Sequence, residues 1–69
     1  MPSTAIRDHD YDAATSRLTV TFVTGRIYVY EKVPPAVAAD FGSANSKGRF
    51  FNKHIRDHYH CREIVASHE

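Results

Sequence analysis

The second half of the chain contains a cluster of positive charge that could bind an anion. Residues 47–62 contain five Lys or Arg residues and one acidic residue, a net charge of +4, although the whole chain has a formal net charge of only +1. Residues 1–46 carry a net charge of −1. Such an uneven distribution can create a local positive field that the total charge conceals. The sequence therefore predicts a surface that attracts anionic groups such as phosphates.

The spacing of these cations is that of one face of an α-helix. Arg49, Lys53 and Arg56 follow an i, i+4, i+7 pattern, so a rotation of about 100° per residue places them on one stripe. The residues on the opposite, apolar stripe are Phe51, Ile55 and Tyr59. We therefore predict a helix over residues 46–59 with one side on a core and the other side available to a ligand.

The start of this predicted helix has the residues of an anion-binding site. Ser46 can cap the first turn, and the free N–H groups of a helix N-terminus attract anions. Gly48 would let a phosphate approach closely, and Lys47 and Arg49 would add charge-assisted hydrogen bonds. The alternative is that Ser46 only caps the helix and the cations are solvated. The predicted nucleic-acid or anion-binding residues are Ser46, Lys47, Gly48, Arg49, Lys53 and Arg56.

Three aromatic residues are candidate contacts for the bases of a nucleic acid. Tyr28 and Tyr30 lie two residues apart on a predicted strand, and aromatic pairs on an open sheet can stack bases. Phe50 lies on the flank of the predicted helix. The alternative is that the two tyrosines belong to the core, which the predicted strand pairing favours.

The histidines, the cysteine and the acidic residues form no complete catalytic or metal-binding motif. His54 and His58 have the i, i+4 spacing of two zinc ligands on a helix, so metal binding stays open as a weaker alternative. The alternating acids of residues 8–12 lack the glycine and the terminal glutamate of a calcium loop. The sequence places no base beside Cys61. We therefore predict no catalytic residue, no metal and no cofactor.

The size and composition are typical of one small domain. The chain has 69 residues and a single cysteine, which suits a reducing compartment. It shows no secretory signal, and no apolar run approaches the roughly 20 residues of a membrane span. We expect one soluble, cytoplasmic, monomeric domain over residues 1–69, with an ordered core at about residues 4–65.

Three stretches in the first half have the patterns of β-strands. Residues 17–22 alternate strictly between apolar and polar side chains, and residues 26–30 follow Gly25 as the return strand. Residues 5–11 alternate more loosely, as an edge strand does. Together they predict a three-stranded antiparallel meander.

The length of the loop at Gly25 decides which side chains of the return strand enter the core. A two-residue loop pairs Phe22 with Ile27, whereas a three-residue loop pairs Phe22 with Arg26 and turns the two tyrosines inward. Threonine is a poor first residue for the two-residue type I′ turn, while the longer loop requires a positive φ only at Gly25. We therefore predict the three-residue loop and inward tyrosines.

Prolines and a glycine divide the rest of the chain. Pro35 suits the first turn of a short helix over residues 36–41, which Gly42 should end. The basic helix over residues 46–59 follows. Residues 60–65 form either a final strand or a packed tail.

Several motifs together give the chain a family resemblance. They are Tyr28-Val29-Tyr30, Val33-Pro34, and the run Ser46-Lys47-Gly48-Arg49-Phe50-Phe51-Asn52 followed by Ile55-Arg56 and Tyr59. This combination resembles the KTSC domain, a small module named after a C-terminal extension of some lysyl-tRNA synthetases and also found as a free-standing bacterial protein. The resemblance extends from about residue 3 to residue 59, and it implies a role related to nucleic acids without an established activity.

These observations predict an α+β fold: a small three-stranded antiparallel β-meander, a short helix, and a longer basic amphipathic helix packed on the sheet. The predicted core residues are Leu18, Val20, Phe22, Tyr28, Tyr30, Val33, Val37, Phe41, Phe51 and Ile55. We predict a non-catalytic module that contacts the phosphates of RNA, for example a tRNA-like molecule. The alternative partner is an acidic protein surface, bound by the same helix or by an edge strand. Neither a membrane nor a small-molecule substrate is expected.

Overall fold

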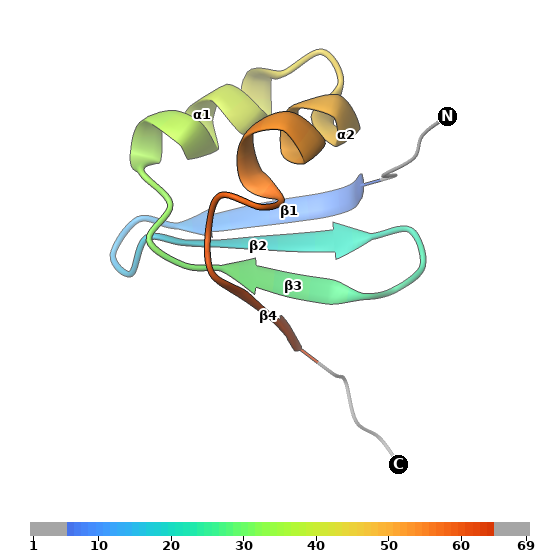
Figure 1. Cartoon of the computed structure of the whole chain (residues 1–69), viewed down its shortest axis with the longest axis horizontal. Helices are drawn as coiled ribbons and strands as arrows, with labels where there is room; N and C mark the ends of the chain where they lie inside the picture. The colour runs from blue at the N-terminus through green and yellow to red at the C-terminus, as the bar shows by residue number, and fades with distance from the viewer. Residues whose placement is uncertain (1–5, 65–69) are drawn as a thin grey trace.

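The β-strands form one antiparallel sheet, and the helices pack on one face of it (Figure 1). The structure is a computed structural model that describes residues 6–64. The elements in chain order are β1 (Ile6–Asp12), β2 (Arg17–Phe22), β3 (Ile27–Tyr30), α1 (Pro35–Ser43), α2 (Lys47–Phe50), the π-helical turn η1 (Phe51–Ile55) and β4 (Cys61–Ile64). The α+β class is confirmed. Residues 4, 5 and 65 of the expected ordered core lie outside the described residues.

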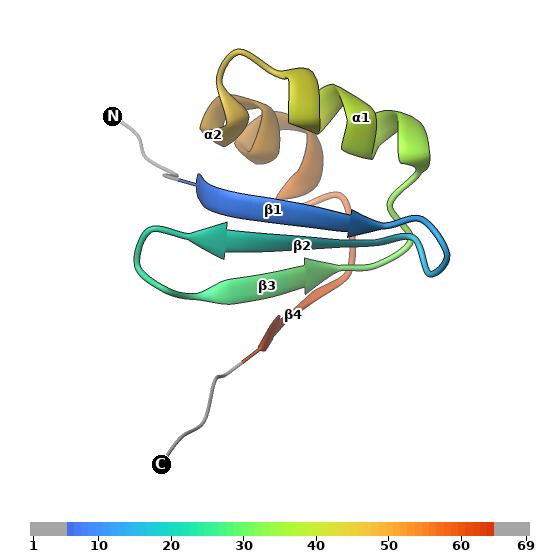
Figure 2. The ribbon, with the colours of Figure 1, turned by 180° about the vertical axis from the view of Figure 1, so that it is seen from behind.

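The sheet has four strands in the order β1-β2-β3-β4, one more than the meander predicted from the sequence (Figure 2). After the helices the chain returns to the sheet, and β4 pairs with β3 from Tyr30 opposite Cys61 to Ile27 opposite Ile64. The N–H of Glu31 also donates to the carbonyl of His60 at 2.9 Å. Of the two alternatives for residues 60–65, the strand is therefore the correct one.

The hairpin between β2 and β3 has the predicted three-residue loop. The N–H of Phe22 donates to the Arg26 carbonyl at 2.9 Å, and the N–H of Gly25 donates to the Phe22 carbonyl at 2.8 Å. Gly25 has a φ of 95°, in the left-handed region that favours glycine. The resulting register pairs Val20 with Tyr28, so both tyrosines of β3 face the helices.

The core lies between the sheet and the helical layer. The buried residues that form it are Leu18, Val20, Tyr30, Val33, Ala38, Phe41, Phe51 and Ile55. Three predicted core residues are only half-buried and pack against its edge: Phe22, Tyr28 and Val37. Val29 is buried on the other face of the sheet, where Thr19 and Arg62 are its strand neighbours. Seven of the predicted residues thus form the core, together with Ala38, which the sequence pattern did not indicate, and the edge is looser near the β2–β3 hairpin.

The first helix is longer than its sequence suggested. It begins at Pro35, one residue before the predicted range of 36–41, and it continues through Gly42 to Ser43. The Ser43 hydroxyl donates to the carbonyl of Ala39 at 3.2 Å, and the N–H of Ala44 donates to the carbonyl of Phe41 at 3.3 Å. Gly42 therefore does not end the helix. The carbonyls of the last turn of α1 are satisfied by hydrogen bonds from the Ser43 hydroxyl and the Ala44 N–H.

The basic helix differs most from the sequence prediction. It begins after Ser46 but is α-helical only to Phe50, and it then widens into the π-helical turn η1. The N–H of Arg56 donates to the carbonyl of Phe51 at 2.8 Å, an i→i+5 bond. The helical segment therefore ends near Arg56 and does not reach Tyr59. None of the helices between residues 6 and 64 has the length and apolarity needed to cross a membrane.

Candidate nucleic-acid interface

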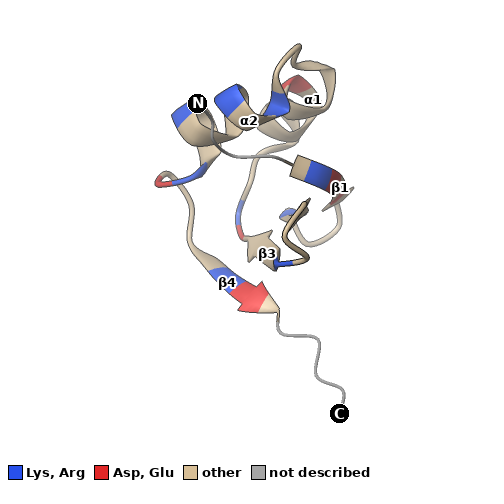
Figure 3. Ribbon diagram, turned by 90° about the vertical axis from the view of Figure 1, so that its right-hand side faces the viewer, with Lys and Arg blue, Asp and Glu red and all other residues tan. Residues whose placement is uncertain are grey.

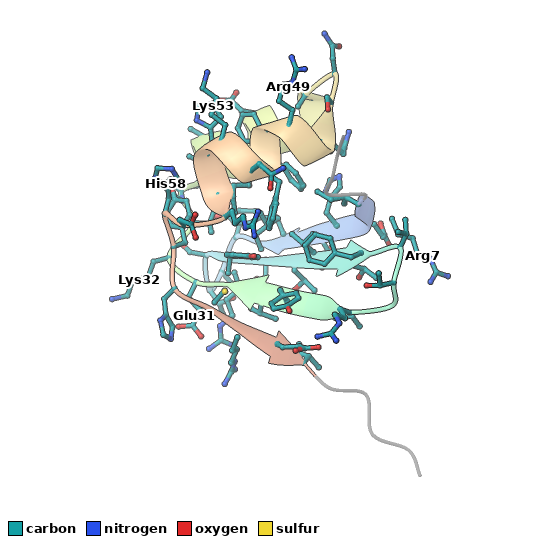
Figure 4. All side chains as sticks on the ribbon, turned by 45° about the vertical axis from the view of Figure 1, so that its right-hand side comes forward. Arg7, Glu31, Lys32, Arg49, Lys53 and His58 are labelled. Atoms are coloured by element: carbon teal, nitrogen blue, oxygen red, sulfur yellow. The ribbon has the colours of Figure 1, made fainter. Side chains whose placement is uncertain are left out.

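The outer side of the α2–η1 segment carries exposed cations. Arg49 and Lys53 are exposed and extend from the side of the segment that faces away from the sheet (Figure 4). Lys47, at the start of α2, is half-buried. The ion pairs found between residues 6 and 64 involve Arg26 with Glu63 and Arg62 with Glu31, and none of these three cations. Their charge is therefore available to an anionic ligand.

Ser46 and Gly48 have structural roles at the start of this segment. The hydroxyl of Ser46 accepts a hydrogen bond from the N–H of Arg49 at 3.3 Å, which is the geometry of an N-cap. The carbonyls of Gly48 and Lys47 accept from the N–H of Phe51. The capping role of Ser46 is thus observed, and it holds Lys47 and Arg49 on the first helical turn.

Arg56 does not continue the stripe of Arg49 and Lys53. Because the π-helical turn adds a residue to the repeat, Arg56 does not continue in line with Lys53 and lies beside Asn52, four residues before it. Its side chain lies in a cleft that also contains Tyr28 and Tyr30, and its Nη1 is 3.5 Å from Oδ1 of Asn52. The predicted single stripe is therefore split between the outer side of the segment and this cleft.

The cleft lies between the β2–β3 hairpin, β4 and the end of the helical segment. Its volume is about 620 Å³. Its lining residues, which define the aromatic cleft, are Phe22, Val23, Thr24, Arg26, Tyr28, Tyr30, Phe51, Asn52, Arg56, Asp57 and Cys61. Aromatic rings and guanidinium groups thus share one open cavity.

The rings of the aromatic cleft pack edge to face. Phe22 contacts Tyr28 with ring centroids 5.6 Å apart and Phe51 at 5.4 Å, and Tyr30 contacts Phe51 at 5.4 Å. This arrangement is the preferred one for aromatic pairs. Tyr30 is 4% exposed and forms the floor, whereas Phe22 and Tyr28 are half-buried and form the wall.

The floor of the aromatic cleft is uncharged. Burial raises the pKa of the Tyr30 phenol well above its ordinary value, and the nearby Cys61 thiol raises it further. The phenol therefore keeps its proton further into the alkaline range than an ordinary tyrosine does. An anionic ligand in the cleft would meet the positive charge of Arg56 and Arg26 without a phenolate beneath it.

The third candidate aromatic contact lies elsewhere. Phe50 packs against Phe41 with ring centroids 6.0 Å apart and against His54 with centroids 4.6 Å apart, and it does not line the aromatic cleft.

The histidines at positions 54 and 58 both contact their own part of the chain. The ring of His54 packs on Phe50, and Nε2 of His58 lies 3.0 Å from the carbonyl oxygen of Lys53. Both histidines are thus engaged with their own segment. Across residues 6–64, no group of three or more His, Cys, Asp or Glu side chains could hold a metal ion.

Sequence reasoning missed several residues of the aromatic cleft. Arg26, Asn52 and Cys61 line it but were not among the candidate site residues. The position of Arg26 could have been predicted from the three-residue loop, because that loop places Arg26 opposite Phe22, on the helical side of the sheet. Asn52 and Cys61 could not be found in this way, since the π-helical turn and β4 bring them to the cleft.

Comparison with known proteins shows which family this chain resembles. The model of the KTSC domain matches residues 2–59. The crystal structure of a KTSC domain protein from Yersinia pestis is similar, with a TM-score of 0.82 and 35% sequence identity over 94% of each chain. A protein of Tsukamurella paurometabola is 39% identical over 57 residues, which are 83% of this chain and 85% of that one.

Longer proteins contain a similar region. A lysine–tRNA ligase of Nostoc punctiforme is 39% identical over 59 residues, which are 86% of this chain and 10% of the ligase. The chain thus spans about a tenth of the length of the lysine–tRNA ligases that it matches. The family model covers most of the chain and the solved KTSC domain protein matches it almost from end to end, so the chain belongs to the KTSC domain family.

Proposed function

We propose that this KTSC domain is a non-catalytic module that binds the phosphates of RNA through the α2–η1 segment. The observation that carries the proposal is that Arg49 and Lys53 on the outer side of that segment, and Lys47 at its start, form no ion pair with another described residue. Lys47, Arg49 and Lys53 would contact successive phosphates, and Arg56 would contact a further one at the aromatic cleft. Arg is well suited to this task because its planar guanidinium can bind a phosphate with two hydrogen bonds.

The relatives support an RNA partner. Three similar proteins are lysine–tRNA ligases, whose name includes an RNA, and they contain a region like this chain within much longer proteins. A small region that adds phosphate contacts would strengthen RNA binding without taking part in the chemistry. We extend that role to this chain, for which the partner class is RNA, for example a tRNA-like molecule.

The test removes the outer cations and measures RNA binding against salt. In Lys47→Gln/Arg49→Gln/Lys53→Gln, three phosphate contacts are lost, and each contributes about −0.7 to the slope of log affinity against log salt for a single strand. We expect the slope to become less negative by about 2. Fluorescence anisotropy of a labelled single-stranded RNA at several salt concentrations measures it.

A matched control removes the same charge from other elements. The variant Arg7→Gln/Arg17→Gln/Lys32→Gln alters three exposed cations outside the α2–η1 segment, two of which Figure 4 labels. It should keep most of the wild-type affinity and slope. Equal losses in the two variants would show that only net charge matters, and a wild-type protein that binds no RNA would overturn the proposal in favour of a protein partner.

A further inference from the structure

The aromatic cleft has the size and the lining of a ligand site. Its volume of about 620 Å³ lies within the range of about 300–1,000 Å³ that small-ligand pockets have. On its rim, Val23 of the β2–β3 loop is 60% exposed, one of the exposed large apolar side chains among the described residues. A small domain that leaves apolar and aromatic surface open beside a guanidinium offers a site for a flat, partly apolar and anionic group.

The aromatic wall can stack a flat ring. Phe22 and Tyr28 are half-buried and form the wall of the cleft, while Tyr30 and Phe51 close it from below. Stacking of one nucleobase on an aromatic side chain stabilises binding by about 1–3 kcal/mol and tolerates any base, since every base has a π face. The wall thus suits an unpaired base, whose faces are free, and excludes one that is stacked inside a duplex.

The polar groups of the cleft suit the rest of a nucleotide. Nη1 of Arg26 is 3.5 Å from Oε2 of Glu63, so this guanidinium already has an acidic partner. Arg56 forms no ion pair with another described residue and is therefore the better candidate to bind a phosphate. Asp57 and Thr24 also line the cleft. A carboxylate can accept hydrogen bonds from the amino groups of bases, and a hydroxyl can donate or accept.

The cleft and the cationic outer side are formed by neighbouring residues of one segment. Asn52, which lines the cleft, and Lys53, which extends outward, are consecutive residues of η1. The π-helical turn thus joins the two surfaces, because it carries Lys53 on one side and brings Arg56 into the cleft on the other. A strand of RNA that follows the outer cations would reach the cleft at the end of η1.

We propose that the aromatic cleft binds one unstacked RNA base on the ring face of Tyr28, with Phe22 at the edge of that base and Arg56 on the phosphate of the same nucleotide. The inference rests on the proposed RNA-binding function and adds a preference for single-stranded RNA to it. Phosphate contacts alone give no such preference, since a duplex also presents phosphates, at a higher charge density.

The experiment compares single-stranded and duplex RNA of the same length in cleft variants. Tyr28→Leu removes the ring but keeps an apolar side chain, and it should weaken single-strand binding about tenfold while leaving duplex binding unchanged. Tyr28→Phe keeps the ring and is the matched control, which should bind both RNAs as the wild type does. Arg56→Gln, at an exposed position, should also weaken single-strand binding more than duplex binding.

The outcomes separate this inference from the proposed function. If Tyr28→Leu and Arg56→Gln bind single strands as the wild type does while the outer triple variant does not, the cleft proposal is overturned and the phosphate-binding function stands. If all cleft and outer variants lose both RNAs equally, the single-strand preference is also overturned.

Adenosine 5′-monophosphate tests the cleft without the outer cations. We expect its addition to shift the amide signals of Tyr28, Arg56 and Cys61 in an NMR titration, and ribose 5-phosphate, which has the phosphate but lacks the base, to leave the signal of Tyr28 in place. Shifts without RNA binding would overturn the proposed RNA-binding function and would leave the cleft as a site for a free nucleotide. Absence of shifts, or equal shifts from both compounds, would overturn the cleft.

Discussion

Tyr30 connects the core to the aromatic cleft. Its ring contacts Phe51 at 5.4 Å, and its phenol lies beside the Cys61 thiol of β4. Burial raises the pKa of this phenol, and the thiol raises it further, so the folded protein keeps the proton under conditions in which an unfolded tyrosine loses it. The residue therefore links the stability of the fold to pH on the alkaline side.

The pH dependence follows from the direction of that shift. An unfolded tyrosine titrates near 10.0, whereas Tyr30 in the fold titrates higher, so its contribution to stability is complete below pH 10.0 and decreases as the pH rises above it. In Tyr30→Phe this loss should disappear. Urea unfolding at about pH 9 and about pH 11 should show a smaller alkaline decrease in the free energy of unfolding for the variant. Parallel decreases in both proteins would contradict the assignment.

At the scale of elements, the π-helical turn determines which side chains share a surface. It keeps Phe51 and Ile55 in the core and brings Arg56 to the aromatic cleft, while Arg49 and Lys53 stay on the outer side. Turns of this kind are often found at functional sites, because the widened repeat changes the direction of the side chains that follow. The element that was predicted as one uniform helix thus serves two surfaces.

The hairpin could be predicted from sequence because its determinants are local. Gly25 and the strict alternation of residues 17–22 are enough to choose the loop length, and the loop length fixes which side of β3 faces the helices. The same register determines which apolar side chains of β2 and β3 face the core. This part of the fold depends on interactions between residues that are close together in the sequence.

The parts that could not be predicted depend on tertiary contacts. The segment 61–64 is short and only half apolar, and it becomes a strand because the open edge of β3 lies beside it. The widening of η1 has no signal in the spacing of Phe51 and Ile55, which suits an α-helix equally well. The cation stripe was therefore only partly predictable, and the aromatic cleft, whose walls include both elements, was not.

The cap at Ser46 gives a prediction at the same scale. Ser46→Ala removes the acceptor for the N–H of Arg49 and should lower the free energy of unfolding by about 1 kcal/mol, measured by urea denaturation. Ser46→Asp should keep the cap, since aspartate is as good an N-cap as serine, but its negative charge beside Lys47 and Arg49 should weaken RNA binding. Unchanged RNA affinity in the stable Asp variant would place the RNA away from this turn.

At the scale of the whole molecule, the helical layer carries the cations of α2, and the face of β1 turned away from that layer carries acids. The cations of α2 lie in the helical layer, above the sheet (Figure 3). The register of β1 pairs Asp10 with Thr19 and Asp12 with Arg17, which turns these acids away from the side of Leu18 and the helices. RNA should therefore approach the helical layer and the aromatic cleft, and it should be repelled from the exposed face of β1.

Chemical-shift mapping of the isotope-labelled protein with a short single-stranded RNA most directly tests the claim that RNA binds the α2–η1 segment and the aromatic cleft. We expect the largest amide shifts at residues 47–56 and at the lining of the aromatic cleft, little change along β1, and smaller shifts when the salt concentration is raised. Shifts that cluster on β1 and the exposed face of the sheet, or no shifts at low salt, would contradict RNA binding by this surface.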